Sequence, residues 1–364
     1  MIIKKCYKLG LIFLISTLLI IGCSKGPDQE KGDEVPGAKK IEGGTLTLYN
    51  WEEYIGSNTL ENFEKETGIH VNEITFQDEE DMLGAVQSDL DAYDLVVSSD
   101  DLVREMRHAK ILVQLDYSKI PNFKHIAKKY HNMPCDPEQK YTVPYLTGTT
   151  GMVVNKKYIK EDTDSWKVLF DKRYKGKLAM LNNSFEVVAA ASKMLGYSIN
   201  ITSPEKIEKV KKLLLEQKTL VQGYYDTETL KDLMIHEKLW AAQIYSGEGL
   251  VVADENENLE YVIPKEGAPV WADFFVMPRD AKHKEEAHMF LNYILRPDVN
   301  ASIASELWYA TPNEAAKPLM DPEVLNSKSV YPPAEVMERC EFFKNTGDVT
   351  RLIAPIWSDL MIKG

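Results

Sequence analysis

The sequence contains little cysteine. Four cysteines occur in 364 residues, and only Cys135 and Cys340 lie beyond the N-terminal region described below. An oxidising compartment would permit a disulfide between these two residues. Their separation in sequence cannot establish that they are close in space, which a disulfide requires. The sequence therefore leaves their pairing open.

Positive charge is also scarce. Lysine and arginine total 43 against 56 acidic residues, which gives a formal net charge of −13. Nucleic-acid binding through a basic face is disfavoured by that sign. Attraction of cations is favoured, although surface acidity often serves only solubility. We therefore expect no nucleic-acid partner.

Common enzyme motifs are absent from the sequence. It has no G-x-S-x-G elbow, no Walker loop and no H-E-x-x-H pair. His283 and His288 lie five residues apart on an amphipathic stretch, a spacing that favours a surface position over a metal site. We therefore expect a protein that is not an enzyme and that uses neither a cofactor nor a metal.

One apolar run stands apart from the rest of the chain, at the N-terminus. Three lysines in the first eight residues precede the apolar residues 9–21. This pattern is typical of a secretion signal and is short for a membrane span. It ends in LIIGC (residues 19–23), which looks like a bacterial lipobox, in which the cysteine is lipidated and becomes the new N-terminus. An ordinary signal peptide that happens to carry a cysteine is the alternative.

Residues 1–22 are thus predicted to be a lipoprotein signal peptide, and Cys23 the lipidated residue. Residues 23–44 are predicted to be a flexible tether, because they hold almost no large apolar side chains that could offset the entropy of ordering. Loss of three lysines with the signal changes the net charge from −13 to −16. We expect a lipid-anchored protein in the periplasm or on the outer face of the cytoplasmic membrane.

The remaining chain is predicted to be α/β and is long enough for two lobes. Expected strands lie at 45–48, 69–76, 94–97, 141–145, 151–155, 177–181, 239–245, 259–264 and 270–278. Expected helices lie at 59–67, 79–90, 101–108, 185–195, 203–217, 283–295, after Pro297, at 333–339 and at 348–361. Small residues at 147–150 predict a flexible join where the chain crosses between lobes, and residues 246–249 predict a loop.

The sequence YNWEEY (residues 49–54) is predicted to form a loop at the C-terminal end of the first strand. Open α/β sheets bind ligands at such strand ends. Aromatic rings and carboxylates together suit a cationic ligand, because rings offer a negative π face and carboxylates a full charge. A structural role for Trp51 and Tyr54, with Glu52 and Glu53 in solvent, is the alternative.

Asp273 is the one charged residue in the apolar run VWADFFVMP (residues 270–278). A buried carboxylate costs several kcal/mol unless a cation or hydrogen bonds compensate it. Asp273 therefore needs an internal partner or a cationic ligand, unless its side of the strand faces solvent. Trp271 lies on the same side of the strand, two residues away.

Six segments in register resemble bacterial spermidine/putrescine-binding proteins, the extracytoplasmic receptors of polyamine ABC transporters. They are LYNWEEY (48–54), FEKETGI (63–69), YDLVVSS (93–99), YKG (174–176), PKEG (264–267), and LRPDV with YATPN (295–299 and 309–313). The resemblance runs from about Thr45 to the C-terminus. It implies a two-lobe, hinged "Venus flytrap" α/β fold that closes on a linear polycation and delivers it to permease subunits.

The resemblance also implies lobes and ligand contacts. The N-terminal lobe would comprise residues 45–147 and 273–318, and the C-terminal lobe residues 148–272 and 319–364. Aromatic rings would sandwich the methylene chain, carboxylates would hold the ammonium groups, Ser99 would lie in the cleft, and a monomer is expected. The implied ligand-binding residues are Trp51, Glu53, Tyr54, Ser99, Glu186, Tyr245, Glu248, Trp271, Asp273 and Tyr309.

This sequence differs from the family pattern at positions that bear on which polyamine is bound. Family members often carry aspartate at the position of Asn183, an aromatic residue at Asp101 and tryptophan at Tyr245. Glu248 matches an acid of putrescine-preferring relatives. The lack of an acid at Asn183 and the presence of Glu248 together favour putrescine over spermidine, while either ligand stays open.

A ferric-ion receptor, or a receptor of the same fold for another small solute, is the alternative function. The adjacent Tyr224 and Tyr225 resemble the paired tyrosines with which ferric-ion receptors chelate the metal. A hydrophobic turn before the next helix would explain the same two residues without a metal.

Overall fold

The computed structural model describes residues 43–344 and 346–362. The predicted signal peptide, the lipidation residue Cys23 and nearly all of the predicted tether therefore lie outside the described residues. In the part of the chain that is described, no helix is long and apolar enough to cross a membrane.

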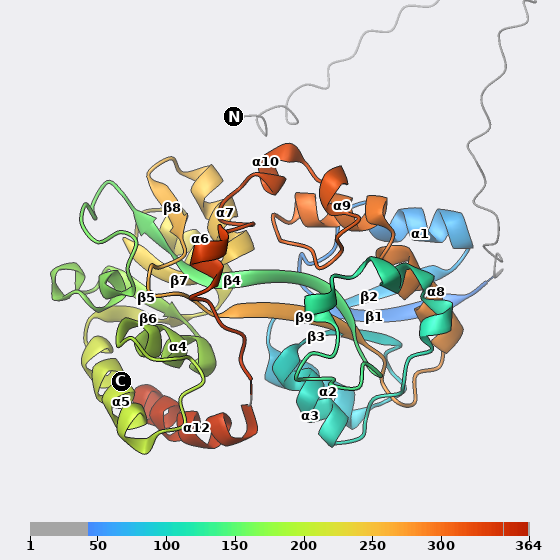
Figure 1. The fold of residues 1–364 in the computed structure, drawn as a ribbon, viewed down its shortest axis with the longest axis horizontal. Helices are drawn as coiled ribbons and strands as arrows, with labels where there is room; N and C mark the ends of the chain where they lie inside the picture. Colours follow the sequence, from blue (N-terminus) through green and yellow to red (C-terminus); the bar gives the residue numbers. More distant parts are fainter. Residues whose placement is uncertain (1–42, 345, 363–364) are drawn as a thin grey trace, which may run out of the picture. The chain divides into compact units, whose positions relative to one another are not determined.

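A nine-stranded mixed sheet organises the described residues, in the order β2-β1-β3-β9-β4-β7-β5-β6, with β8 paired to β4 (Figure 1). The strands are β1 (Thr45–Trp51), β2 (His70–Phe76), β3 (Leu95–Ser99), β4 (Val143–Asn155), β5 (Leu178–Leu181), β6 (Val221–Tyr225), β7 (Ala241–Tyr245), β8 (Leu259–Val262) and β9 (Val270–Val276). β1, β2 and β3 are parallel, and β5 is parallel to both β6 and β7. The central strands β9 and β4 are antiparallel to each other and to their neighbours.

The helices pack around this sheet. They are α1 (Thr59–Thr67), α2 (Glu79–Ser88), α3 (Asp100–His108), α4 (Ser184–Met194), α5 (Pro204–Gln217), α6 (Thr227–Ile235), α7 (Ser246–Glu255), α8 (Lys284–Ile294), α9 (Pro297–Glu306), α10 (Pro322–Leu325), α11 (Ala334–Met337) and α12 (Thr346–Ile362). Local chemistry sets several ends. Asp78 caps α2 by accepting from the backbone N–H groups of Glu80 and Asp81, and Gly68 ends α1 with φ of 77°.

The predicted break between two strands at residues 147–150 is wrong. β4 runs without interruption through this stretch, and Thr147, Gly148 and Thr149 pair with β9. A Cβ atom on Gly148 would lie 2.4 Å from Cζ2 of Trp271, so glycine is needed here for close approach of the indole. The small residues therefore permit packing between two long strands and do not mark a flexible join.

Three other sequence expectations need correction. β1 continues to Trp51, so residues 49–51 belong to the strand and not to the loop. Residues 246–249 form the first turn of α7 and not a loop. β6 (Val221–Tyr225) and α6 (Thr227–Ile235) were not among the expected elements with bounds, although the turn considered for Tyr224 and Tyr225 placed a helix after them.

Apolar side chains gather in separate cores joined by β4 and β9. One core takes its residues from 46–146 and 272–330, for example Leu48, Phe274 and Phe290. A second core and a third, on residues 152–268 and 353–360, include Trp166 and Leu230. Cys135 lies in the first core and Cys340 against the second, and both are free thiols.

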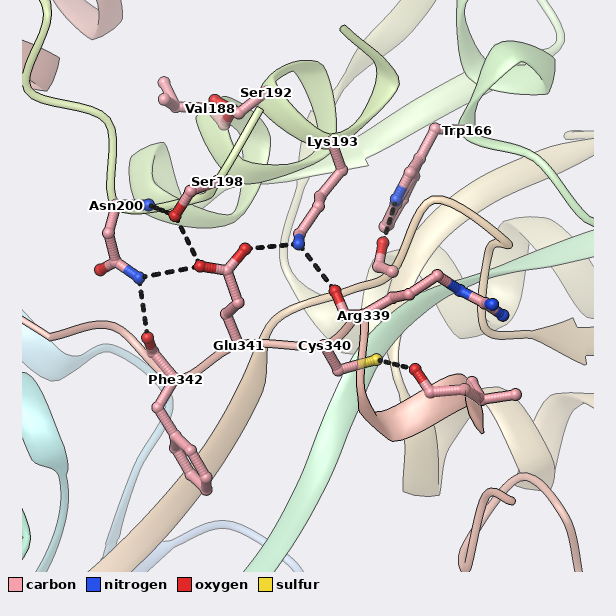
Figure 2. A network of polar contacts seen from close by, with 12 residues as sticks. Trp166, Val188, Ser192, Lys193, Ser198, Asn200, Arg339, Cys340, Glu341 and Phe342 are labelled. Atoms are coloured by element: carbon pink, nitrogen blue, oxygen red, sulfur yellow. Dashed lines mark hydrogen bonds and ion pairs between the residues drawn. The ribbon is translucent and has the colours of Figure 1, made fainter. Parts of the chain in front are cut away.

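The segment around Glu341 adds a further connection (Figure 2). Its backbone lies beside the start of β9, where the N–H of Val270 donates to the carbonyl of Glu341 at 2.8 Å. Lys193 Nζ, on α4, lies 2.5 Å from Glu341 Oε1 and 2.7 Å from the carbonyl oxygen of Arg339. Gly267, with φ of 91°, permits the close approach, because a Cβ there would lie 1.9 Å from the Arg339 carbonyl oxygen.

The pair between Lys193 and Glu341 is predicted to stabilise the fold. The Lys193 side chain is 7% exposed, so Lys193→Met leaves the Glu341 carboxylate without its cation and should lower the free energy of unfolding by about 2–4 kcal/mol. Urea unfolding measures this. Lys209→Met is the matched control, because Lys209 pairs with Glu205 on an exposed helix face and should change stability by about 0.5 kcal/mol or less. Equal effects of the two variants would contradict the assignment.

Candidate functional site

Asp273 lies in the middle of β9, directly opposite Ser99 of β3. Its side chain is buried, which excludes the alternative of a solvent-facing carboxylate. The Tyr54 hydroxyl donates to Oδ2 of Asp273 at 2.7 Å. Burial raises the pKa of Asp273 to about 7, since the hydrogen bond from Tyr54 offsets only part of the desolvation and nearby Glu248 adds to it.

Four aromatic rings lie in a connected series beside this carboxylate. The ring centroids of Tyr54 and Tyr309 are 5.6 Å apart, those of Tyr309 and Trp271 are 5.2 Å apart, and those of Trp271 and Tyr245 are 6.1 Å apart. Each pair is T-shaped, an arrangement that aromatic rings favour. The indole nitrogen of Trp271 is buried without a hydrogen-bond acceptor. These rings come from the loop after β1, from β9, from the end of β7 and from the segment after α9.

Glu248 joins this group from the first turn of α7. The Tyr309 hydroxyl donates to its carboxylate. Burial raises the pKa of Glu248, and the hydrogen bond from Tyr309 and the charge of Lys231 offset part of that effect. Gly247 allows the ring of Tyr309 to come close, because a Cβ at Gly247 would lie 2.3 Å from Cζ of Tyr309.

Glu186 lies in the first turn of α4, whose N-terminus is capped by the side chain of Asn183. The carboxylate is buried, and its Oε2 has no hydrogen-bond partner. Burial raises the pKa of Glu186 to about 8; the Thr150 hydroxyl lowers it slightly, and the charges of Asp101 and Glu79 raise it. Asn183 thus has a structural role as the cap of α4.

Glu79 and Asp100 are two further acidic residues of this region that were not among the predicted ligand-binding residues. Glu79 opens α2, and burial raises its pKa to about 8, with Ser99 lowering it and Asp273 and Asp101 raising it. Asp100 opens α3 and is buried, which raises its pKa well above the usual range. A signal existed: each residue comes three positions after the end of a predicted strand, near the strand ends where ligands bind in α/β sheets.

We define the acid–aromatic cluster as Tyr54, Glu79, Ser99, Glu186, Tyr245, Glu248, Trp271, Asp273 and Tyr309. In the described part of the chain, no ion pair joins Glu79, Glu186 or Asp273 to a lysine or arginine. Burial raises the pKa of Tyr245, and the charges of Glu186, Glu79, Glu248 and Asp273 raise it further. The Tyr245 hydroxyl therefore lies near these four carboxylates. Three of its acids, Glu79, Glu186 and Asp273, therefore lie among aromatic rings without an ion pair to a lysine or arginine of the described residues.

Two predicted ligand contacts lie outside this buried group. The Trp51 indole is partly buried against Phe76, with centroids 4.5 Å apart. Glu53, with φ of 53°, is exposed and lies 3.8 Å from Lys231. Glu52 is also exposed, as expected, and its carboxylate accepts a hydrogen bond from Gln77. The roles of Trp51 and Glu53 as ligand contacts stay predictions.

The two adjacent tyrosines of the ferric-ion alternative do not converge. Tyr224 packs on Trp357 in the second core, whereas Tyr225 packs against the third core on the opposite face of β6. Burial raises the pKa of Tyr224 to about 12, which disfavours the phenolate that a ferric ion needs. Among the residues described, no group of three or more His, Cys, Asp or Glu side chains could hold a metal ion.

The chain is similar to known proteins over most of its length. The family described as bacterial extracellular solute-binding protein matches residues 58–329. The spermidine/putrescine-binding periplasmic protein of Salmonella typhimurium is 36% identical over 318 residues, which cover 87% of this chain and 91% of the relative. The putrescine-binding periplasmic protein PotF of Escherichia coli is 34% identical, with 82% of this chain and 86% of the relative covered.

Solved structures of similar proteins agree with the fold. The substrate-binding protein PotD of the Streptococcus pneumoniae spermidine/putrescine ABC transporter superposes with a TM-score of 0.78 at 31% identity, covering 88% of this chain and 98% of that one. The Tp0655 lipoprotein of Treponema pallidum superposes with a TM-score of 0.76 at 25% identity, covering 87% and 99%. The predicted fold class and family resemblance are confirmed. This chain belongs to the bacterial extracellular solute-binding protein family.

Proposed function

We propose that this protein is an extracytoplasmic receptor that binds polyamines and delivers them to the permease of an ABC transporter. The observation that carries the proposal is a set of three acidic side chains that lie among aromatic rings and form no ion pair with a lysine or arginine in the described residues. Asp273 and Glu186 are buried, and Glu79 is partly buried with its Oε1 atom out of contact with solvent. A linear polycation supplies the missing charges and a methylene chain that fits between rings. The names of the relatives, which bind spermidine and putrescine or putrescine, support the same class of ligand.

The energies suit such a ligand. A micromolar dissociation constant corresponds to about −8 kcal/mol. Two or three charge-assisted hydrogen bonds of roughly 1.5–3 kcal/mol each, with cation–π contacts of about 0.5–2 kcal/mol each, supply this amount after association costs. Binding also relieves the desolvation of the carboxylates, because the ligand brings the compensating charge to them.

A diamine fits the distribution of charge better than a longer polyamine. The charge of Glu79 raises the pKa of Glu186, and the charge of Glu248 raises the pKa of Asp273, so we take these as two acidic pairs; Asp273 also acts on Glu79. The charges of both pairs raise the pKa of Tyr245. One ammonium group at each pair, with the methylene chain along the rings of Tyr245 and Trp271, is the proposed pose. This arrangement agrees with the preference for putrescine expected from Glu248.

The protein is proposed to close around its ligand by a hinge. β4, β9 and the segment around Glu341 connect the separate cores, and the lobes would rotate about these connections to present a closed shape to the permease. Met320, Val324 and Val330 pack in the first core, so we propose that the N-terminal lobe extends to about residue 330 and not only to 318.

The family is extracellular or periplasmic. We propose that lipidation of Cys23 and the tether at 23–44 hold this member, as a monomer, at the outer face of the cytoplasmic membrane. The lipobox-like residues 19–23 support this proposal, as does the description of the Treponema pallidum relative as a lipoprotein. Catalysis is not part of the proposed function.

Calorimetry of the mature protein with putrescine, spermidine and spermine tests the ligand class. We expect binding of one polyamine per protein molecule at micromolar or lower concentration, with putrescine bound at least as tightly as spermidine. The matched control is 1,4-butanediol, which has the same carbon chain without charges and should give no binding heat. Failure of all three polyamines to bind, or colour development with ferric ion, would reject the proposal in favour of another solute.

Asp273→Asn should weaken putrescine binding by at least tenfold without unfolding the protein. The amide keeps the shape and still accepts from Tyr54, but it no longer attracts an ammonium group. The free variant should be as stable as the wild type or more stable at pH 8.5, because a carboxyl whose pKa is raised to about 7 is destabilising once ionised. Glu52→Gln, an exposed neighbour of Tyr54, is the control and should leave the affinity unchanged. Unaltered affinity in Asp273→Asn would remove Asp273 from the binding site.

Ligand binding should release protons near neutral pH. Asp273, with a pKa of about 7, and Glu186 and Glu79, with pKa values of about 8, are partly protonated in the free protein at pH 7. A bound ammonium group lowers these pKa values, so affinity should increase from pH 6 to pH 8.5. Calorimetry at pH 7 in phosphate and in Tris should give different apparent heats, because the two buffers take up protons with different enthalpies. Equal heats would mean that these carboxyls do not titrate with binding.

A further inference from the structure

Lys231 is the lysine that lies next to the acid–aromatic cluster. It projects from α6, and its side chain is only 16% exposed. Its ammonium nitrogen lies 2.8 Å from Oε1 of Glu228 and 3.8 Å from Oε2 of Glu53. Glu228 belongs to the same helix, whereas Glu53 follows β1. Lys231 therefore joins two segments that are far apart in sequence.

The charge of Lys231 also reaches Glu248. Burial by itself would lower the pKa of the Lys231 ammonium, but the carboxylates of Glu228, Glu53 and Glu248 raise it above its usual value. Lys231 is therefore protonated and positively charged at neutral pH. Helix α6 packs on α7, whose first turn carries Glu248. Glu248 thus has the Tyr309 hydroxyl as a donor and the charge of Lys231 nearby.

The two acidic pairs, Glu186 with Glu79 and Glu248 with Asp273, differ in whether a lysine lies nearby. Glu186 and Glu79 have no ion pair with a lysine or arginine in the described part of the chain. Glu248 lies on α7, which packs against the helix of Lys231, and the charge of Lys231 lowers the pKa of Glu248. One end of the cluster therefore carries an ammonium group that belongs to the protein. A ligand ammonium beyond Glu248 would have to lie next to a like charge.

We propose that Lys231 is a specificity-determining residue that takes the place of a further ligand ammonium group and thereby restricts the site to short diamines. This inference rests on the proposed polyamine-binding function. Glu53 in this arrangement holds Lys231 and does not hold the ligand. A triamine that extends past Glu248 meets the repulsion of Lys231 and also competes with it for Glu53.

A purely structural role for Lys231 makes a different prediction. If the contact between Lys231 and Glu53 only fastened two parts of the protein together, its removal would change the affinities for all polyamines by the same factor. A specificity role changes the ratio of the affinities. The ratio of the dissociation constants for spermidine and putrescine is therefore the deciding quantity.

Calorimetry of the mature Lys231→Met protein with putrescine and spermidine tests the proposal. We expect spermidine affinity relative to putrescine to rise at least fivefold over wild type, because methionine keeps the apolar stem and removes the charge. Lys231→Arg keeps the charge and should retain the wild-type ratio. The control Lys157→Met removes an exposed lysine that is paired with Glu237 and should also retain it. Thermal melts of each variant establish that it is folded.

Glu53 provides a second, independent variant. In Lys231→Met, Glu53 has no lysine to hold and can bind a third ammonium group of the ligand. Glu53→Gln should therefore weaken spermidine binding in the Lys231→Met protein, and this loss should be at least threefold larger than the loss that Glu53→Gln causes in the wild type. A relative affinity that stays within twofold of wild type in Lys231→Met, or an equal loss for both ligands, overturns the proposal and leaves the polyamine receptor intact. Absence of polyamine binding by the wild type overturns the function and this inference together.

Discussion

The antiparallel pairing of β4 with β9 is the constraint on which the site depends. These strands connect the separate cores, and β9 carries both Trp271 and Asp273 in its paired region. On its other edge, β9 pairs with β3 and so sets Ser99 opposite Asp273. Gly148 in β4 leaves the space that the indole of Trp271 occupies. Residues far apart in the sequence meet because β4 and β9 run side by side (Figure 1).

That framework holds carboxylates in surroundings where ionisation is unfavourable. Such an arrangement lowers stability in the free protein, as buried acids without cations do. Natural sequences keep costly groups of this kind where function requires them. Tyr54 and Tyr309, by donating hydrogen bonds to Asp273 and Glu248, fix these two carboxylates in position. The receptor is thus preorganised for positive charge before a ligand arrives.

Much of this could be predicted from the sequence. The helix at Thr59–Thr67 and the strand at β9 follow from periodicity and capping residues, and the single acid in an apolar strand identified Asp273. Prediction failed where residue type has two explanations. Glycine and threonine at 147–150 suggested flexibility, but they serve close packing between strands. Glu79 looked like an ordinary helix start, because its burial depends on residues that only the folded chain brings near it.

The helix α4 has a property that follows from its two ends. Glu186 lies in its first turn and Lys193 in its last, seven residues apart and therefore on the same face of the helix. Lys193 is fixed by Glu341 and the carbonyl of Arg339, near the end of the chain. The alignment of a carboxylate in the site thus depends on a segment more than 150 residues later. Loss of the contacts that Glu341 and Arg339 make with Lys193 would therefore release the end of α4 opposite to Glu186.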